Sequence, residues 1–247
     1  FTSESVTEGH PDKICDQISD AVLDALIKQD PMSRVACETT ATTGIITVMG
    51  EITSKAAIDY QTVIRNVVRD IGYDNAEYGF DCNTCAIVNM IHEQSPDIAL
   101  GVDRSLEAKA GEMTDGLDIG AGDQGMMFGY ACDETPELLP LTFVLVNRMM
   151  RAFENCGERI FAPDGKGQVS VEYDEKTGKP VRVVKVLMSN AIDYRFARGK
   201  NGCAIERKAR KIAFDCLKGC VDKKTEFLFN PTGEWQAINS CSAADSG

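Results

Sequence analysis

The stretch Glu8-Gly9-His10-Pro11-Asp12-Lys13 organises the rest of the chain, together with Ile14-Cys15-Asp16-Gln17-Ile18-Ser19-Asp20-Ala21-Val22 that follows it. Pro11 favours the first turn of a helix, because the N–H that proline lacks would be unpaired there. Asp30-Pro31 ends the helical pattern. Between these limits the apolar residues recur at helical spacing and predict one buried face: Ile14, Ile18, Val22 and Leu26.

His10, Asp12 and Lys13 crowd the start of this predicted helix. Backbone N–H groups and the helix dipole favour anions at such a helix start. An imidazole, a carboxylate able to hold Mg²⁺ and an ammonium are the groups that a polyphosphate site needs. An ordinary solvated helix cap also uses such residues. On these residues alone, both interpretations stay open.

The composition is that of a soluble globular protein, with 43 % hydrophobic and 26 % charged residues among 247. No apolar run approaches the roughly 20 residues of a membrane span, and no signal-peptide pattern is present, so a membrane is not an expected partner. The net charge of −12 argues against nucleic acid as a partner. It also means that an anionic nucleotide would need local cations or a divalent metal.

Ten cysteines without a secretion signal predict a reducing, cytoplasmic setting. Cys82-Asn83-Thr84-Cys85 has zinc-like spacing, but no second Cys-x-x-Cys follows and the chain has only two histidines. Cys216 and Cys220 lie one helical turn apart. The cysteines are therefore predicted to pack as small apolar residues rather than to bind metal.

The first half of the chain predicts a helix, a hairpin, a second helix and a strand. The hairpin comprises residues 34–40 and 45–52, and each of its strands carries one acid, Glu38 and Glu51, for which the commoner orientation is toward water. Residues 85–91 predict a strand buried on both faces. The second helix, residues 56–71, has an apolar face made of Ile58, Val63, Val67 and Ile71.

Residues 94–119 break this regularity, since they are rich in Ser, Gly, Asp and Thr. A stretch of that length without elements of its own is typical of a functional loop or lid. It ends at Gly120-Ala121-Gly122-Asp123-Gln124-Gly125, where glycines permit close approach of the backbone to a ligand.

The second half repeats the order of the first. A helix is predicted from Pro140 through Phe153, strands over 168–173 and 181–188, a helix over 205–221 and a strand over 226–229. The pattern predicts an α/β (α+β) protein of repeated helix–hairpin–helix–strand units, with mixed sheets covered by helices.

Two further features of the second half bear chemistry. Pro163-Asp164-Gly165-Lys166 is predicted to be a loop before the hairpin, from which Lys166 could reach a phosphate or simply decorate the surface. Trp235, the only tryptophan, follows the predicted turn at 230–234 and could stack on a base or close the core.

Taken together, several motifs resemble S-adenosylmethionine synthetases (methionine adenosyltransferases) in their order and approximate spacing. They are the opening residues 1–13, Cys37-Glu38-Thr39, Gly50-Glu51, residues 94–98, residues 120–125, Met127-Phe128-Gly129-Tyr130-Ala131 and Asn230-Pro231-Thr232-Gly233.

The resemblance implies three similar α/β domains around a pseudo-threefold axis, with active sites between two subunits of a homo- or hetero-oligomer. The two repeated units would be the first two of these domains. The expected division is an N-terminal domain over 1–96, a mobile gate loop over 97–119, a central domain over 120–235, and the start of an otherwise absent C-terminal domain over 236–247.

The reaction implied by the resemblance is attack of the methionine sulfur on C5′ of ATP. Triphosphate is released and then split to pyrophosphate and phosphate, with Mg²⁺ and K⁺ as cofactors. Because a thioether sulfur is already a nucleophile and needs no general base, the enzyme would act by positioning the two reactants and by stabilising the charge on the departing polyphosphate.

The resemblance also implies roles for individual residues. His10 would lie beside the oxygen that leaves C5′, and Lys166 and Asp123 would complete the catalytic set. Asp12 would bind Mg²⁺ and Glu38 would bind K⁺. The expected ATP contacts are His10, Asp164, Lys166, Glu234, Trp235 and Asp245, and the expected methionine contacts are Glu51, Gln94 and Asp245.

The chain departs from the family pattern at Ala162, where Arg is usual, and over 239–244, where Gly-Gly-Pro is expected. It also reaches Gly247 before the family's later Arg and Lys motifs. The leading hypothesis is therefore a synthetase that needs a complementing chain carrying the third domain. The alternatives are a non-catalytic interaction or regulatory subunit of a full-length homologue, and a generic Mg-nucleotide-binding domain.

Overall fold

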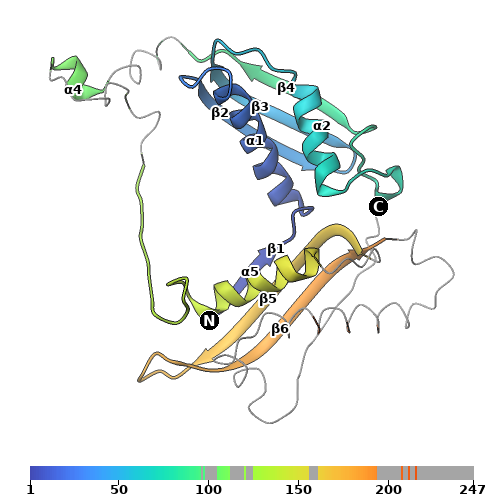
Figure 1. Ribbon diagram of the computed structural model, residues 1–247, viewed down its shortest axis with the longest axis vertical. Coiled ribbons are helices and arrows are strands. Elements are labelled where there is room, and N and C mark those ends of the chain that lie inside the picture. Colours follow the sequence, from blue (N-terminus) through green and yellow to red (C-terminus); the bar gives the residue numbers. More distant parts are fainter. Residues whose placement is uncertain are drawn as a thin grey trace. The chain divides into compact units, whose positions relative to one another are not determined.

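The computed structural model of the chain describes residues 1–95, 97, 105–111, 120, 125–155, 161–193, 207, 211 and 215. The chain divides into two units (Figure 1). The first comprises Phe1–Ile14, Val68–Thr84 and Tyr130–Gly247, and the second comprises Cys15–Val67 and Cys85–Gly129. In its described part each unit has a three-stranded sheet with helix packed on it, which confirms the predicted mixed α/β class.

The sheet of the second unit has the order β2-β3-β4. Strands β2 (Arg34–Thr42) and β3 (Ile45–Thr53) form the predicted antiparallel hairpin. Both strands run further than predicted, so the turn shortens to Thr43-Gly44, and Gly44 adopts the left-handed φ of 74° that glycine permits. Strand β4 (Ala86–His92) lies parallel to β3.

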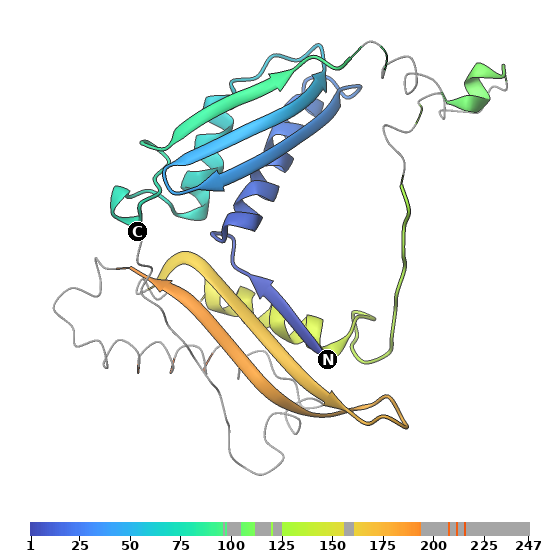
Figure 2. The same ribbon diagram turned by 180° about the vertical axis from the view of Figure 1, so that it is seen from behind.

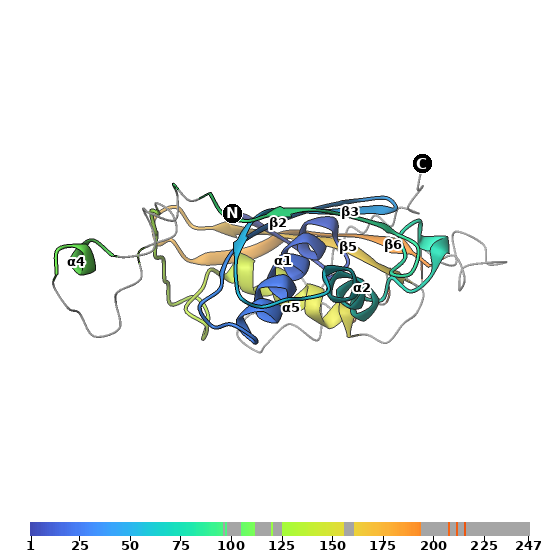
Figure 3. The ribbon, with the colours of Figure 1, turned by 90° about the horizontal axis from the view of Figure 1, so that it is seen from above.

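Two helices cover one face of this sheet (Figures 2 and 3). In α1 (Pro11–Ile27) the predicted apolar face is confirmed, since all four of its residues are buried. Helix α2 (Tyr60–Ile71) begins four residues later than predicted, because the Asp59 carboxylate accepts from the Thr62 N–H at 3.3 Å and caps the helix there. Its buried face centres on Ile64 and Val68 rather than on the predicted residues, one position and about 100° further around the helix.

Strand β4 corrects the prediction of a strand buried on both faces. It is an edge strand, and Val88 and Met90 are 37 % and 61 % exposed in the single chain. A run of apolar residues indicates that a strand is at least partly buried. It does not indicate whether helices cover one face of the sheet or both. Here the helices cover only one face.

The sheet of the first unit has the order β1-β5-β6, and all its pairs are antiparallel. Helix α5 (Leu141–Glu154) covers one face, as predicted from Pro140 onward, with Pro140 as its N-cap. The core between α5 and the sheet consists of Leu141, Leu145, Val146, Met149, Met150, Phe153, Val169, Val171, Val186 and Met188. Strand β1 (Thr2–Val6) has no counterpart in the sequence-based prediction, because a short polar segment acquires strand character here only by pairing with β5.

Strands β5 (Phe161–Tyr173) and β6 (Pro180–Ile192) form the predicted hairpin, but both are longer than expected. The segment Pro163–Lys166, predicted to be a loop, therefore lies inside β5. A register shift between Phe161 and Gly165 makes this possible. It leaves Pro163 outside the ladder, where its missing N–H costs no bond.

Within the predicted loop 94–119, the described Asp97 is helical, and residues Leu106–Lys109 form the short helix α4, capped by the Ser105 hydroxyl. A 3-10 turn, η1 (Ala76–Tyr78), follows α2. The predicted helix 205–221 is described only at residues 207, 211 and 215, each of them helical. The predicted strand 226–229 lies outside the described residues.

Cys82 and Cys85 are buried thiols, as expected of cysteines that pack as apolar residues. Cys216 and Cys220 lie outside the described residues. Among the helices that the structure describes, none combines the length and the apolar character needed to cross a membrane.

Candidate functional site

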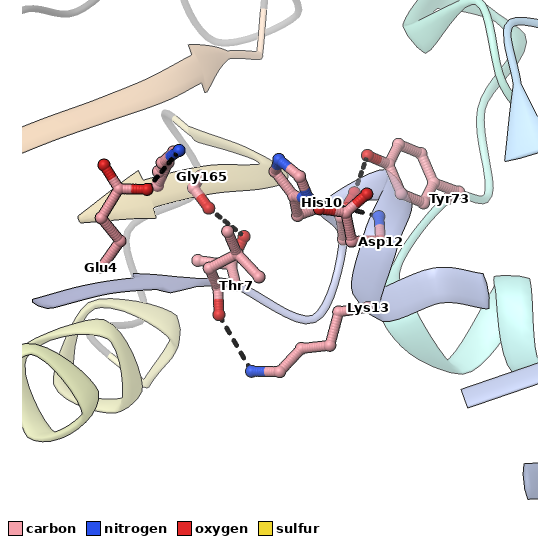
Figure 4. Close-up of polar contacts among 10 residues, drawn as sticks. Glu4, Thr7, His10, Asp12, Lys13, Tyr73 and Gly165 are labelled. Carbon is pink, nitrogen blue, oxygen red and sulfur yellow. Dashed lines mark hydrogen bonds and ion pairs between the residues drawn. The ribbon is translucent and has the colours of Figure 1, made fainter. Parts of the chain in front are cut away.

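His10 caps the start of α1 with its carbonyl and its side chain (Figure 4). The His10 carbonyl accepts from the Ile14 N–H at 2.9 Å, so His10 is the helix cap. Its ring nitrogen Nδ1 accepts from the Asp12 N–H at 3.2 Å. A nitrogen that accepts carries no proton, and in a neutral imidazole the proton then lies on Nε2. His10 therefore presents one N–H donor away from the helix.

Asp12 lies in the first turn beside this ring. Its carboxylate is 3.7 Å from Nδ1 of His10, and its side chain is 86 % exposed. An exposed carboxylate at a helix N-terminus can accept a cation on its outer side without being desolvated first.

The loop leading to His10 is tied down at each of its residues. The Thr7 hydroxyl donates to the carbonyl of Pro163 at 2.7 Å, and the Thr7 N–H donates to the carbonyl of Gly165 at 2.9 Å. The Glu8 N–H donates to the Glu154 carboxylate at 2.8 Å, and the Gly9 carbonyl accepts from the Tyr73 hydroxyl at 2.7 Å.

Gly9 itself lies against Pro163. A Cβ at position 9 would come within 2.5 Å of the carbonyl carbon of Pro163 and 2.6 Å of its carbonyl oxygen. Only glycine allows this close approach of the two backbones. The contact brings His10 and the Pro163-Asp164 segment together.

Asp164 is the charged member of that segment. Burial raises the pKa of the Asp164 carboxyl, and the electrostatic interaction with the nearby His10 opposes the shift. A half-buried carboxylate that interacts electrostatically with an imidazole is typical of binding and catalytic sites. The structure thus brings together three residues predicted to act in one site: His10, Asp12 and Asp164.

Lys166 is placed differently from the prediction of a loop lysine. It lies within β5, in register with Val6 of β1 and Ser189 of β6. Its ammonium is 2.7 Å from the Glu4 carboxylate, which also accepts from the Gln168 amide at 2.9 Å. Both partners of this pair are about half exposed, so the pair stabilises the fold little and can open.

Lys13 does not extend toward the outer side of the helix start. Its ammonium donates to the carbonyl of Val6 at 2.9 Å, in a partly buried position (Figure 4). The predicted crowding at the helix start therefore holds for the side chains of His10 and Asp12 but not for that of Lys13. Two of these side chains face outward, and the third ties the helix to the end of β1.

The acids predicted in the hairpin belong to the second unit. Glu38 is in register with Met49 on β3, and Glu51 is in register with Ala36 and His92. Cys37 and Thr39, which alternate with Glu38, lie on the face that carries α1, where the Ser19 hydroxyl pairs with that of Thr39 at 2.8 Å. Glu38 and Glu51 therefore share the face of the sheet without helices.

Gln94 is the other described residue of the expected methionine site. Its Oε1 is buried and has no hydrogen-bond partner among the described residues. A buried amide oxygen without a partner costs about 1–3 kcal/mol, so a ligand N–H or a water at this position would stabilise the fold.

The cation sites implied by the sequence can be judged from the donor atoms present. Mg²⁺ is commonly held by one or two carboxylates together with substrate phosphates. The exposed Asp12 carboxylate fits that mode, and Glu38 offers oxygen of the kind that K⁺ binds. In the part of the chain that is described, no group of three or more His, Cys, Asp and Glu side chains gathers as a complete protein cage.

Asp123, Glu234, Trp235 and Asp245 lie outside the described residues. The sequence analysis did not identify four residues that hold the site residues in place without being predicted site residues themselves: Glu4, Thr7, Tyr73 and Glu154. Glu4 and Thr7 lie in the opening motif and could have been found there. Tyr73 and Glu154 carry no local signal, because their partners are distant in the sequence.

Comparison with known families gives two matches. Residues 1–96 match the S-adenosylmethionine synthetase N-terminal domain, and residues 118–235 match the S-adenosylmethionine synthetase central domain. The first match contains His10 and Asp12, and the second contains Asp164 and Lys166. Because an N-terminal and a central domain of one enzyme match in succession over most of the chain, the chain belongs to the S-adenosylmethionine synthetase family.

Proposed function

We propose that the chain forms part of a site that makes S-adenosylmethionine from ATP and L-methionine. The methionine sulfur attacks C5′, and the S–C5′ bond forms as the C5′–O bond breaks. The bonding electrons leave with triphosphate, which water then splits to phosphate and pyrophosphate. Since the sulfur needs no base, the protein's task is to hold the reactants in line and to stabilise the departing negative charge.

The observation that carries this proposal is the hydrogen bond that Nδ1 of His10 accepts from the Asp12 N–H. Asp12 occupies Nδ1 through its backbone N–H, so the ring can direct an Nε2–H donor at the oxygen leaving C5′. A donor aimed at charge that develops only in the transition state accelerates the chemical step. The helix N-terminus that His10 caps favours the same anion.

The remaining roles are those that the resemblance to the family implies. Asp164 contacts the nucleoside, and Lys166 exchanges Glu4 for a phosphate oxygen. Glu51 and Gln94 hold the amino and carboxylate ends of methionine, and Glu234, Trp235 and Asp245 complete the nucleotide site, with Asp245 also near methionine. Asp12 would hold Mg²⁺ and Glu38 would hold K⁺, and these cations would neutralise polyphosphate charge. Asp123 is proposed to lie near the reacting groups.

We further propose that these two domains do not suffice for turnover. The ammonium of Lys13 is bound to the Val6 carbonyl, and Lys166 must leave Glu4 before it can bind a phosphate, so these two lysines alone supply little positive charge for a triphosphate. Each charge-assisted hydrogen bond missing from a bound triphosphate costs about 1.5–3 kcal/mol. Further Lys and Arg residues are therefore required, from a C-terminal domain and from a second subunit of an oligomer.

Formation of S-adenosylmethionine from ATP and labelled methionine, with Mg²⁺ and K⁺, tests both parts of the proposal. The 247-residue chain is assayed alone, and then with the C-terminal domain of a full-length family member added. We expect negligible product from the chain alone and sustained turnover from the mixture. The mixture containing the His10→Asn variant should be inactive.

The other outcomes are equally informative. Robust synthesis by the rigorously pure chain would overturn the need for a complementing domain while supporting the activity. No synthesis in any mixture would overturn the activity. If the chain then changed the turnover of a full-length homologue, it would act as the alternative, a non-catalytic regulatory subunit.

A further inference from the structure

Tyr73 makes a buried contact with the residue that precedes His10. It lies two residues after the end of α2 and is 7 % exposed. Its hydroxyl donates to the Gly9 carbonyl at 2.7 Å (Figure 4). That carbonyl belongs to the peptide group joining Gly9 to His10. The bond therefore holds the carbonyl side of the peptide group from which His10 projects, while the N–H side donates to the Thr7 carbonyl at 3.1 Å.

Tyr73 is itself held on several sides. Its ring packs edge-to-face on Tyr78 at 5.9 Å and on Phe80 at 5.1 Å between centroids. Its backbone N–H donates to the Val68 carbonyl at 3.1 Å, and its carbonyl accepts from the Cys82 N–H at 2.9 Å. A side chain fixed in this way has little rotational freedom to lose, so its hydroxyl is a rigid donor.

The other residues of the loop have different anchors. Thr7 is bonded to β5, and Glu8 is bonded to Glu154 at the end of α5. Gly9 has no side chain and meets Pro163 with its backbone. Without the Tyr73 bond, the peptide group between Gly9 and His10 would keep only the 3.1 Å bond that its N–H donates to the Thr7 carbonyl, within the same loop. Its carbonyl side would be free to turn, and glycine is the residue whose backbone turns most easily.

The charge around Tyr73 keeps its hydroxyl a donor. Burial raises the pKa of Tyr73 well above its usual range, and the negative charge of Asp164 and the neighbouring Tyr78 add to the effect. The hydroxyl thus stays protonated throughout the physiological range.

We propose that Tyr73 is a positioning residue for His10, holding the Gly9–His10 peptide so that the imidazole keeps its orientation beside Asp164. This inference rests on the proposed function, in which His10 donates to the leaving oxygen. It adds a residue that touches neither substrate nor metal but acts through the backbone of the residue before His10.

The test compares Tyr73→Phe with Tyr78→Phe. Each variant removes one hydroxyl from the same aromatic cluster and keeps the ring. The Tyr78 hydroxyl, however, donates to the Asp193 carboxylate at 2.6 Å and not to the His10 loop. The chain has two histidines, so the ring Cε1–H signals of His10 and His92 can be assigned by NMR in the 247-residue chain without any ligand.

We expect Tyr73→Phe to shift or split the His10 signal while the His92 signal stays in place. Tyr78→Phe should leave the His10 signal where it is in the wild-type chain. In the mixture with the C-terminal domain, Tyr73→Phe should lower kcat about tenfold to a hundredfold, with the KM for ATP little changed, because misplacement of a catalytic group acts on the chemical step.

An unchanged His10 signal in Tyr73→Phe would overturn the inference. So would equal shifts in both variants, since they would mean that the cluster acts only through general packing. If Tyr73→Phe does not fold, the hydroxyl proton of Tyr73 in the wild-type chain provides the test. A hydroxyl proton in a buried 2.7 Å bond should exchange slowly enough to give its own signal, and its absence would contradict the bond. If the wild-type mixture makes no S-adenosylmethionine, the proposed function fails, whereas the NMR comparison still tests Tyr73.

Discussion

The contact between Gly9 and Pro163 yields the most direct prediction about stability. In Gly9→Ala the new Cβ would lie 2.5 Å from the carbonyl carbon of Pro163 and 2.6 Å from its oxygen, and it would also meet the Pro163 Cβ. Two of these three atoms belong to the backbone of β5, which cannot move aside as a flexible side chain can. Overpacking of this kind costs about 1–3 kcal/mol.

For a chain of this size each kcal/mol lowers Tm by about 2–4 °C, so we expect a decrease of roughly 2–12 °C. Gly129→Ala is the matched control, because no atom of the described residues lies within 4 Å of the place that a Cβ would take there. It should change stability by less than about 0.5 kcal/mol. Thermal unfolding followed by circular dichroism measures the midpoints of both variants.

Relief of the clash must also separate the His10 loop from Asp164, so Gly9→Ala should weaken nucleotide binding as well. If Gly9→Ala and Gly129→Ala had the same denaturation midpoint, the close approach of these two segments would be refuted. The account of the site would then lose its geometric basis.

Three further predictions concern individual side chains. Burial raises the pKa of Asp164, so its ionised form destabilises the fold at neutral pH. Asp164→Asn should raise Tm at neutral pH while it weakens nucleotide binding. The gain in Tm should be absent below the ordinary Asp pKa of about 4 and should grow as pH rises through the raised pKa of Asp164. Thermal melts recorded across this pH range measure it. In the assay with the C-terminal domain added, His10→Asn should lower turnover far more than ATP affinity. Asp12→Asn should raise the Mg²⁺ concentration needed for half-maximal rate. Near-normal kinetics in both variants would mean that the start of α1 is not part of the site. Trp235 is the only tryptophan, so a nucleotide that stacks on it should change the fluorescence, and Trp235→Ala should cost about 1–3 kcal/mol of binding measured by calorimetry; an unchanged spectrum at saturation would contradict the stacking.

Local patterns were enough to predict the elements whose formation depends on neighbouring residues. Ile14, Ile18, Val22 and Leu26 repeat at helical spacing, and all four are buried in α1. The two hairpins and α5 were likewise predicted, because alternation and turn residues act over a few positions. The clustering of His10 and Asp12 followed from the position of Pro11 at the helix start.

Long-range pairing could not be predicted in this way. Strand β1 exists because Thr2 to Val6 pair with residues of β5, far away in the sequence. The same pairing places Lys166 inside a strand beside Glu4. The half-burial of Asp164 and the bond from Tyr73 to Gly9 depend on the packing of segments distant in sequence. The buried face of α2 was missed by one residue, since Val63 and Ile64 are equally apolar and only the packed sheet distinguishes them.

The central claim is that His10 at the start of α1 faces the bound polyphosphate. The most direct measurement is the NMR signal of the His10 ring as a non-hydrolysable ATP analogue and Mg²⁺ are added to the chain complemented with the C-terminal domain, with binding followed by calorimetry. The account predicts that the His10 signal moves in proportion to occupancy while the signal of His92, on strand β4, stays in place. A His10 signal that does not move at saturating nucleotide would contradict the account.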